Sequence, residues 1–213
     1  MDFRQSIIKA VKAGLNIELD NEQSNSIEWI VYQFYKMGDN DKRKLFYILA
    51  TSWNETKFRN IEERYGPVGL QTQYWGYHGF GLSQLTWKGN YEKYAKIFGI
   101  DIVSNPSLIL NPELGSFILV HGMMTGNFTG KKLGDFINET TDYKGARWVV
   151  NSQDNAQQIA DWASAIESNF VTPEITMVTS GAGDTNSSQN ILIIGSLILM
   201  IIGISIYIYK IYL

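Results

Sequence analysis

An apolar run near the carboxyl end constrains this chain more than any other feature. Between Ile191 and Tyr209, only two glycines and two serines interrupt the large apolar residues. About 20 apolar residues suffice to cross a bilayer as a helix. The run also lacks the polar face of a helix packed on a protein core. We therefore expect one membrane-spanning helix within residues 191–213, with Lys210 as its flanking cation.

The composition before this run changes twice and divides the chain into three parts. Residues 171–190 are rich in Thr, Ser, Gly and Asn, which is typical of a flexible linker. Residues 1–170 are long enough to bury one core, since 45% of the sequence is hydrophobic. The expected organisation is a domain, a linker and a single C-terminal membrane anchor.

Helical periodicity dominates the domain, which predicts a mainly α fold. Apolar residues recur at helical spacing in the segments 3–15, 27–37, 45–49, 91–98, 114–121 and 159–166. We expect Asp39 or Asn40 to cap the third helix and Asp154 to cap the last. A shorter helix is expected over residues 129–138. Residues 57–81 are rich in Gly, Tyr and Gln, so we expect at most a small β-hairpin there.

Charge and residue usage exclude several classes of protein. A net charge of −3 does not favour nucleic acid as a partner, because phosphate binding needs an excess of Lys and Arg. There is no cysteine, and His78 and His121 lie far apart in sequence, so no metal site is expected. The order of Gly76, Gly79 and Gly81 does not match a dinucleotide or phosphate-binding loop, and we expect no cofactor.

Glutamates are the candidate catalytic groups. Glu55 follows an apolar helix and is flanked by Trp53, surroundings that favour a protonated carboxyl able to act as a general acid. An ordinary solvated or helix-capping role is the alternative. Glu62 and Glu63 supply a second carboxylate, and a pair of this kind is the apparatus of glycoside hydrolysis. Beside Arg64, they would alternatively form a charge-paired loop.

A stretch from Gly79 to Tyr91 combines glycines, amides, hydroxyls and aromatic rings, which is typical of a surface that binds sugars. Trp87 and Tyr91 would stack on sugar faces, together with Trp75 and Tyr77. Gln84, Thr86 and Asn90 would bind hydroxyl and N-acetyl groups. The alternative is that most of these aromatic residues belong to the core.

Three segments together resemble glycoside hydrolase family 19, which comprises chitinases and related phage and bacterial endolysins. They are Ala50-Thr51-Ser52-Trp53-Asn54-Glu55-Thr56-x-Phe58, Gly79-x-Gly81-x-x-Gln84-Leu85-Thr86-Trp87-x-x-Asn90-Tyr91, and the pairs Asn105-Pro106 and Asn111-Pro112. The resemblance covers roughly residues 45–170. The segment from Gly145 to Asn151 is similar to a late segment of that family, which places Asn151 in the substrate cleft.

The resemblance implies a lysozyme-like, two-lobed fold that hydrolyses β-1,4 links next to N-acetylhexosamine with inversion. Glu55 matches the general acid. Glu63 best matches the base that activates water, with Glu62 as the alternative. Thr86 matches the residue that helps to hold this water. The family's substrate-binding positions match Gln84, Asn90, Tyr91 and Asn151.

Two residues depart from the family pattern, because Asn54 replaces a histidine and Phe80 replaces an arginine. The leading hypothesis is a membrane-anchored glycosidase of a phage or virion that cuts peptidoglycan, with chitin as the alternative glycan. It would lie in the virion membrane or the host cell envelope. The departures motivate another hypothesis, a degenerate glycan-binding or structural virion membrane protein. A lytic transglycosylase is a further alternative.

Overall fold

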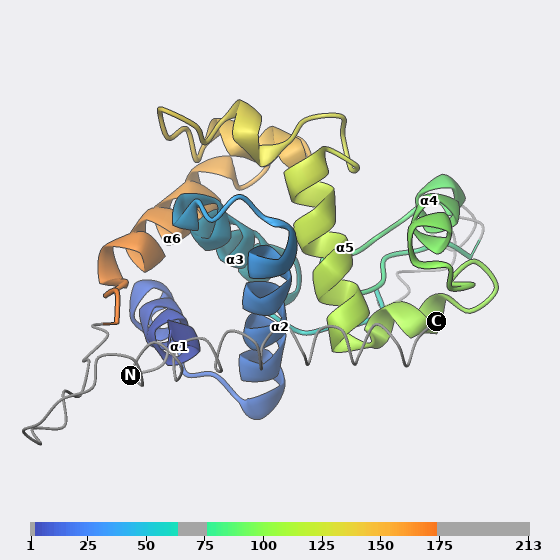
Figure 1. The fold of residues 1–213 in the computed structure, drawn as a ribbon, viewed down its shortest axis with the longest axis horizontal. Coiled ribbons are helices and arrows are strands. Elements are labelled where there is room, and N and C mark those ends of the chain that lie inside the picture. The colour runs from blue at the N-terminus through green and yellow to red at the C-terminus, as the bar shows by residue number, and fades with distance from the viewer. Residues whose placement is uncertain (1–2, 64–75, 174–213) are drawn as a thin grey trace, which may run out of the picture. The chain divides into compact units, whose positions relative to one another are not determined.

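A computed structural model describes residues 3–63 and 76–173, and this part of the chain is mainly helical, as predicted (Figure 1). Its α-helices are α1 (Phe3–Leu15), α2 (Asn21–Met37), α3 (Lys42–Thr56), α4 (Lys88–Phe98), α5 (Pro112–Thr125) and α6 (Ala156–Asn169). Short 3₁₀ helices are η2 (Pro106–Leu110), η3 (Leu133–Asp135) and η4 (Gly145–Val149). Pairing between strands is limited to isolated bridges in the described residues.

Local sequence explains where the helices begin, with one correction. Asp20 caps α2 and forms a reciprocal capping box with Gln23. The cap of α3 is Asp41, whose side chain accepts a hydrogen bond from the backbone of Arg43, so the prediction of Asp39 or Asn40 was wrong. Asn40 has a φ of 64°, a left-handed conformation that delays the helix by one residue.

Two further helix predictions are corrected after α5. The helix expected over residues 129–138 is reduced to the single turn η3. Gly130 has a φ of 87°, and a helix cannot pass through such a residue. The last helix follows Asn155 rather than Asp154, and Asn155 makes no side-chain capping bond. The carbonyl of Asp154 instead accepts a hydrogen bond from Arg147.

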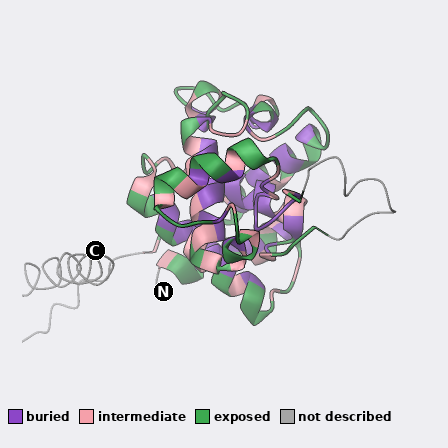
Figure 2. Ribbon diagram, turned by 90° about the vertical axis from the view of Figure 1, so that its right-hand side faces the viewer, coloured by how far each residue is buried: buried purple, intermediate pink, exposed green. Residues whose placement is uncertain are grey.

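The first and larger of two apolar clusters lies among α1, α2, α3 and α6. Helix α6 packs on both α1 and α3, and α2 packs along α5. Gly14 permits the close approach of α1 and α6, because a Cβ atom there would lie 2.6 Å from the backbone nitrogen of Ile166. Figure 2 shows buried residues gathered in the interior of the described part of the chain, with exposed residues around them. Most buried side chains of this cluster come from helices, and the segments between them contribute Phe58, Leu82, Ile137 and Tyr143.

A second apolar cluster gathers around α4, η2 and the first half of α5. Its fully buried members are Tyr91, Ile102, Ile109 and Ile118. Helix α5 contributes to both clusters, since Leu119 and its C-terminal neighbours belong to the first. In Figure 1, α5 accordingly stands between α4 and the remaining helices.

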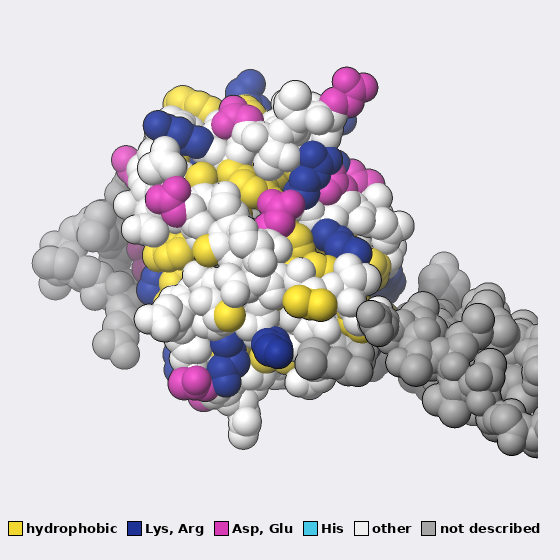
Figure 3. Space-filling view, turned by 90° about the vertical axis from the view of Figure 1, so that its left-hand side faces the viewer, with side chains coloured by type: hydrophobic (Ala, Val, Ile, Leu, Met, Phe, Trp, Pro, Cys, Tyr) yellow, Lys and Arg dark blue, Asp and Glu magenta, His cyan; other side chains and the backbone are white. Residues whose placement is uncertain are grey.

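Charges of both signs are interspersed on the face shown in Figure 3, in keeping with the nearly balanced sequence. Within residues 3–63 and 76–173, no helix combines the length and the apolar character that a membrane crossing needs. The predicted linker from residue 174 onward and the predicted span from Ile191 to Tyr209 lie outside the described residues.

Candidate functional site

Glu55 lies in the last turn of α3, where the helix ends against the rest of the chain. The helix stops because Lys57 adopts a left-handed conformation with a φ of 55°. Ten of the residues of α3 are buried, which fixes the helix in the first apolar cluster. The side chain of Glu55 is 17% exposed. It is therefore a carboxylate at the edge of the core, as predicted.

A buried arginine holds this carboxylate. Arg147, on η4, places Nη1 2.7 Å from Oε1 of Glu55. The Nε of Arg147 donates to the carbonyl of Asp154 at 3.0 Å, which fixes the guanidinium from its other side. The side chain of Arg147 is 3% exposed. Sequence reasoning missed this residue, and its only signal was its place within the segment from Gly145 to Asn151.

The residue that replaces the family histidine also contacts Glu55. The amide of Asn54 donates to Oε1 of Glu55 at 3.2 Å and accepts from the amide of Asn155 at 3.4 Å. Both bonds to Glu55 therefore end on Oε1. Among the described residues, Oε2 receives no hydrogen bond, which leaves it available to an external group.

The predicted apolar neighbour of Glu55 has a different role. The ring of Trp53 packs on Phe58 with their centroids 5.5 Å apart, and the ammonium of Lys57 lies 4.7 Å from the centroid of Trp53. Burial lowers the pKa of Lys57, and the charge of Glu55 opposes this shift. Lys57 thus contributes a cation in electrostatic reach of Glu55.

The two candidate bases are held differently from Glu55. Glu63 accepts a hydrogen bond at Oε2 from the backbone of Gly79 at 2.9 Å, and its own backbone N–H donates to the carbonyl of Gly79 at 2.7 Å. Glu62 places Oε1 2.7 Å from Nε2 of His78. Glu62 and Phe80 also form an antiparallel bridge. Both glutamates are exposed.

The stretch after Gly79 folds as a tight turn that binds its own backbone. Phe80 and Leu85 exchange backbone hydrogen bonds, and the turn requires a φ of 50° at Gln84. The amide of Gln84 donates to the carbonyls of Ile61 and Gly81. Gln84 therefore ties this turn to the segment that carries Glu62 and Glu63.

Three more predicted site residues lie at the start of α4. Trp87 is 50% exposed and is the residue immediately before the helix. The amide of Asn90 donates to the carbonyl of Thr86 at 2.8 Å. The side chains of Thr86 and Asn90 are half-buried. Trp87 is thus the large apolar ring that this segment presents to solvent.

Two residues of the motif lie in the second apolar cluster. Tyr91 is 0% exposed, and its hydroxyl lies 2.7 Å from the carbonyl of His78 and 3.0 Å from that of Leu85. A wholly buried ring cannot stack on a sugar, so Tyr91 acts on the site by holding the turn. Phe80, at the position of the family arginine, is also buried and packs on His78 with ring centroids 4.7 Å apart.

Asn151 belongs to the neighbourhood of Arg147. Its backbone N–H donates to the carbonyl of Arg147 at 3.1 Å, and its exposed side chain accepts from the backbone of Ser152. Hydrogen bonds thus connect Glu55, Arg147 and Asn151, and others connect Glu63 and Gln84 to the turn that begins at Gly79. No hydrogen bond or ion pair among the described residues joins Glu55 to Glu63. The predicted Trp75 and Arg64 lie outside the described residues.

Metal ligands and hollows do not add to this site. Within the described residues, no group of three or more His, Asp or Glu side chains could hold a metal ion. One surface hollow of about 630 Å³ is lined by α1 and the turn after it, from Gln5 to Glu18. Another of about 380 Å³ is lined by residues between Asn40 and Phe46 and between Glu167 and Thr172. Glu55 lines neither hollow.

Comparison with known proteins does not assign a family. No protein-family model matches the sequence, and no curated protein matches it. The functional argument therefore rests on the motif and on the geometry around Glu55.

Proposed function

We propose that this chain is a membrane-anchored glycoside hydrolase that cleaves β-1,4 bonds in the glycan strands of peptidoglycan. The observation that carries the proposal is the way in which Glu55 is held. Glu55 is a partly exposed carboxylate whose Oε1 is bound by a buried arginine, and its Oε2 accepts no hydrogen bond from the described residues. The family-like residues from Gly79 to Tyr91 lie in the segment that binds Glu63. The membrane anchor is the run from Ile191 to Tyr209.

Glu55 is the proposed general acid, and the absence of a hydrogen bond to its Oε2 from the described residues supports this role. A proton on Oε2 would pass to the oxygen of the leaving sugar as the glycosidic bond breaks. The carboxylate that remains is stabilised by the Arg147 guanidinium, 2.7 Å from Oε1, because a buried cation interacts strongly with a developing negative charge. Arg147 and Asn54 also restrict rotation of the carboxyl group.

Glu63 is the proposed base. One of its oxygens is held by the backbone N–H of Gly79, and the side chain is exposed to water. In an inverting hydrolase such a group removes a proton from the attacking water. Trp87 would offer a sugar-stacking ring, and Asn90 and Thr86 would offer polar groups beside it. The two apolar clusters, which share α5, support a lysozyme-like arrangement of two lobes.

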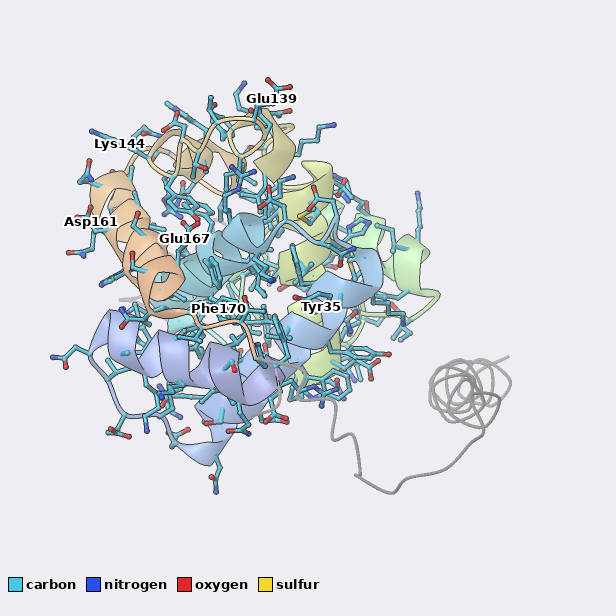
Figure 4. All side chains as sticks on the ribbon, turned by 60° about the vertical axis from the view of Figure 1, so that its left-hand side comes forward. Tyr35, Glu139, Lys144, Asp161, Glu167 and Phe170 are labelled. Atoms are coloured by element: carbon cyan, nitrogen blue, oxygen red, sulfur yellow. The ribbon has the colours of Figure 1, made fainter. Side chains whose placement is uncertain are left out.

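The test compares Glu55→Gln with Glu139→Gln in the full-length chain in detergent micelles. Glu139 is exposed and lies beside Asn138, which binds Arg43 at the opposite end of α3 from Glu55, so it is a matched control (Figure 4). Reducing ends are measured on purified peptidoglycan and on chitin oligomers. Glu55→Gln is expected to lower the rate at least about 100-fold, and Glu139→Gln to leave it unchanged. Wild type that cuts neither glycan, or an active Glu55→Gln variant, contradicts the proposal.

One observation favours a second candidate, a lytic transglycosylase. Both candidate bases are already engaged, Glu62 by His78 and Glu63 by Gly79, whereas a transglycosylase needs a single acidic residue. Mass spectrometry of the products separates the two reactions, since hydrolysis gives reducing ends and transglycosylation gives anhydro sugar ends. Saturable binding of glycan without either product would instead identify a degenerate glycan-binding protein.

A further inference from the structure

Helix α3 presents a row of three polar side chains on the side that carries Glu55. Tyr47, Thr51 and Glu55 are spaced four residues apart, so their side chains lie above one another along the helix. Only Glu55 reaches the surface, since Tyr47 and Thr51 are both 0% exposed. The row therefore runs from the interior of the first apolar cluster to the proposed catalytic carboxyl.

The two inner hydroxyls are neighbours whose hydrogen-bonding capacity is not satisfied by the described residues. Neither Oη of Tyr47 nor Oγ1 of Thr51 makes a hydrogen bond of good geometry within residues 3–63 and 76–173. A buried polar group without a partner costs about 1 to 3 kcal/mol, and internal water commonly satisfies such groups. Two neighbouring hydroxyls of this kind make a polar spot inside an otherwise apolar cluster.

Arg147 reaches the outer end of this row, because its guanidinium binds Glu55. Burial raises the pKa of Tyr47, while the charge of Arg147 and a hydrogen bond with the hydroxyl of Thr51 act in the opposite direction. The guanidinium has five N–H donors, of which one binds Glu55 and one binds the carbonyl of Asp154. Donors remain for a water molecule beside the hydroxyls.

The position of Tyr47 is fixed from its other side. Its ring stacks on Tyr143 with centroids 5.8 Å apart and an angle of 12° between the planes. The hydroxyl of Tyr143 donates to Oε2 of Glu167 at 2.8 Å. Figure 4 shows Glu167 on the inner side of α6, whereas Asp161 on the same helix points outward. The ring of Tyr47 thus cannot turn to place its hydroxyl elsewhere.

We propose that Tyr47 and Thr51 are positioning residues that bind an internal water shared with Arg147 and thereby fix the orientation of the Glu55 carboxyl. This role rests on the proposed function, because it describes how the general acid of that reaction is held. The water accepts a hydrogen bond from the guanidinium and donates to the hydroxyl oxygens, which completes the donor geometry of Arg147. The guanidinium in turn keeps Oε1 of Glu55 bound and Oε2 turned outward.

The kinetic test uses Tyr47→Phe and Thr51→Val, which remove a hydroxyl and keep the shape of the side chain. Each is expected to lower kcat by about ten- to hundredfold with little change in KM, because misorientation of a catalytic group affects the chemical step. Thr51→Ser should restore kcat, since it restores the hydroxyl. Tyr94→Phe is the matched control, and it should leave kcat unchanged, because it removes the hydroxyl of another buried tyrosine, in the second apolar cluster.

A second readout does not depend on activity. A crystal structure of the full-length wild-type chain should show a water within hydrogen-bonding distance of Oη of Tyr47 and Oγ1 of Thr51, and Tyr47→Phe should lose it. Wild-type kcat in both Tyr47→Phe and Thr51→Val, or a site without water, overturns the inference. If wild type cuts no glycan but the water is present, the proposed function fails while the hydration site stands.

Discussion

Glu55 and Glu63 are both candidate catalytic carboxylates, but the protein holds them by different means. Glu55 is bound by side chains, Arg147 and Asn54, that come from the well-packed helical part of the chain. Glu63 is bound by the backbone of Gly79, within an exposed segment paired through isolated bridges. One carboxylate is thus positioned by a buried ion pair, and the other by the conformation of a loop.

The difference shows which changes each carboxylate should tolerate. A carboxylate held by a buried side chain is sensitive to single substitutions far away in sequence. A carboxylate held by a backbone N–H depends instead on the conformation of the backbone. It is therefore sensitive to changes at the glycines and turn residues that allow this conformation. Four predictions, arranged from the largest expected effect to the smallest, test this division.

Replacing Arg147 with Met should have the largest effect. It leaves the charge of Glu55 at the edge of the core without its partner, and we expect the free energy of unfolding to fall by about 3 to 5 kcal/mol. The double variant Arg147→Met with Glu55→Leu should recover most of this loss, because no charge is left unpaired. Denaturant unfolding of the full-length chain measures both. A loss under about 1 kcal/mol in the single variant would show that the pair does not support α3.

Glu63→Gln and Glu62→Gln test which glutamate acts as the base. Glu63→Gln should lower the rate of glycan cleavage by about 100-fold, because it removes the proposed proton acceptor. Glu62→Gln should leave the rate close to that of wild type, since Glu62 is occupied by His78. The initial rate on peptidoglycan is the measurement. The reverse pattern would assign the role of base to Glu62.

Gly81→Ala and Gly89→Ala test the dependence of the Glu63 segment on its backbone. Gly81 has a φ of 76°, and a Cβ atom there would lie 2.7 Å from Cγ2 of Ile109. The left-handed backbone alone should cost about 1 to 2 kcal/mol. Gly89 lies in α4 with nothing within 4 Å of an added Cβ, so Ala should stabilise the helix by about 0.5 kcal/mol. Equal stabilities of the two variants would contradict the argument.

Asp41→Ala should have the smallest effect, about 1 kcal/mol, because it removes the cap of the helix that carries Glu55. Burial opposes ionisation of Asp41, but hydrogen bonds from Arg43 outweigh it and lower the pKa of this carboxyl. The ion pair therefore contributes stability above the unfolded pKa of about 3.8, and the contribution disappears as the pH falls through the lower folded pKa.

Asp41→Asn keeps the cap and removes the charge, so it isolates the pH-dependent part. Unfolding curves of wild type and Asp41→Asn should differ at pH 7 and converge in acid below about pH 4. A difference that persists unchanged in acid would show that the Arg43 pair contributes nothing.

The sequence predicted the helices because their apolar residues repeat at helical spacing, and it placed Glu55 at the end of α3 for the same reason. It did not reveal Arg147, which is separated from Glu55 by 92 positions and lies in a segment without periodicity. It also could not separate Trp87, which is exposed, from Tyr91, which is wholly buried. Trp87 precedes α4 and has a φ of 72°, so its ring does not share the helix face of Tyr91, and no local pattern encodes this backbone conformation.

The end of α6 has a mechanical consequence. The ring of Phe170, directly after this helix, packs on Phe3 of α1 and Phe46 of α3, with centroids 5.5 Å and 5.4 Å away. A pull on the chain beyond this point is therefore shared by three helices and does not unwind α6 from its end. The helix that receives part of this load is α3, which carries Glu55. Tension on the proposed tether would thus reach the candidate catalytic carboxyl through about two and a half turns of α3, from Phe46 to Glu55.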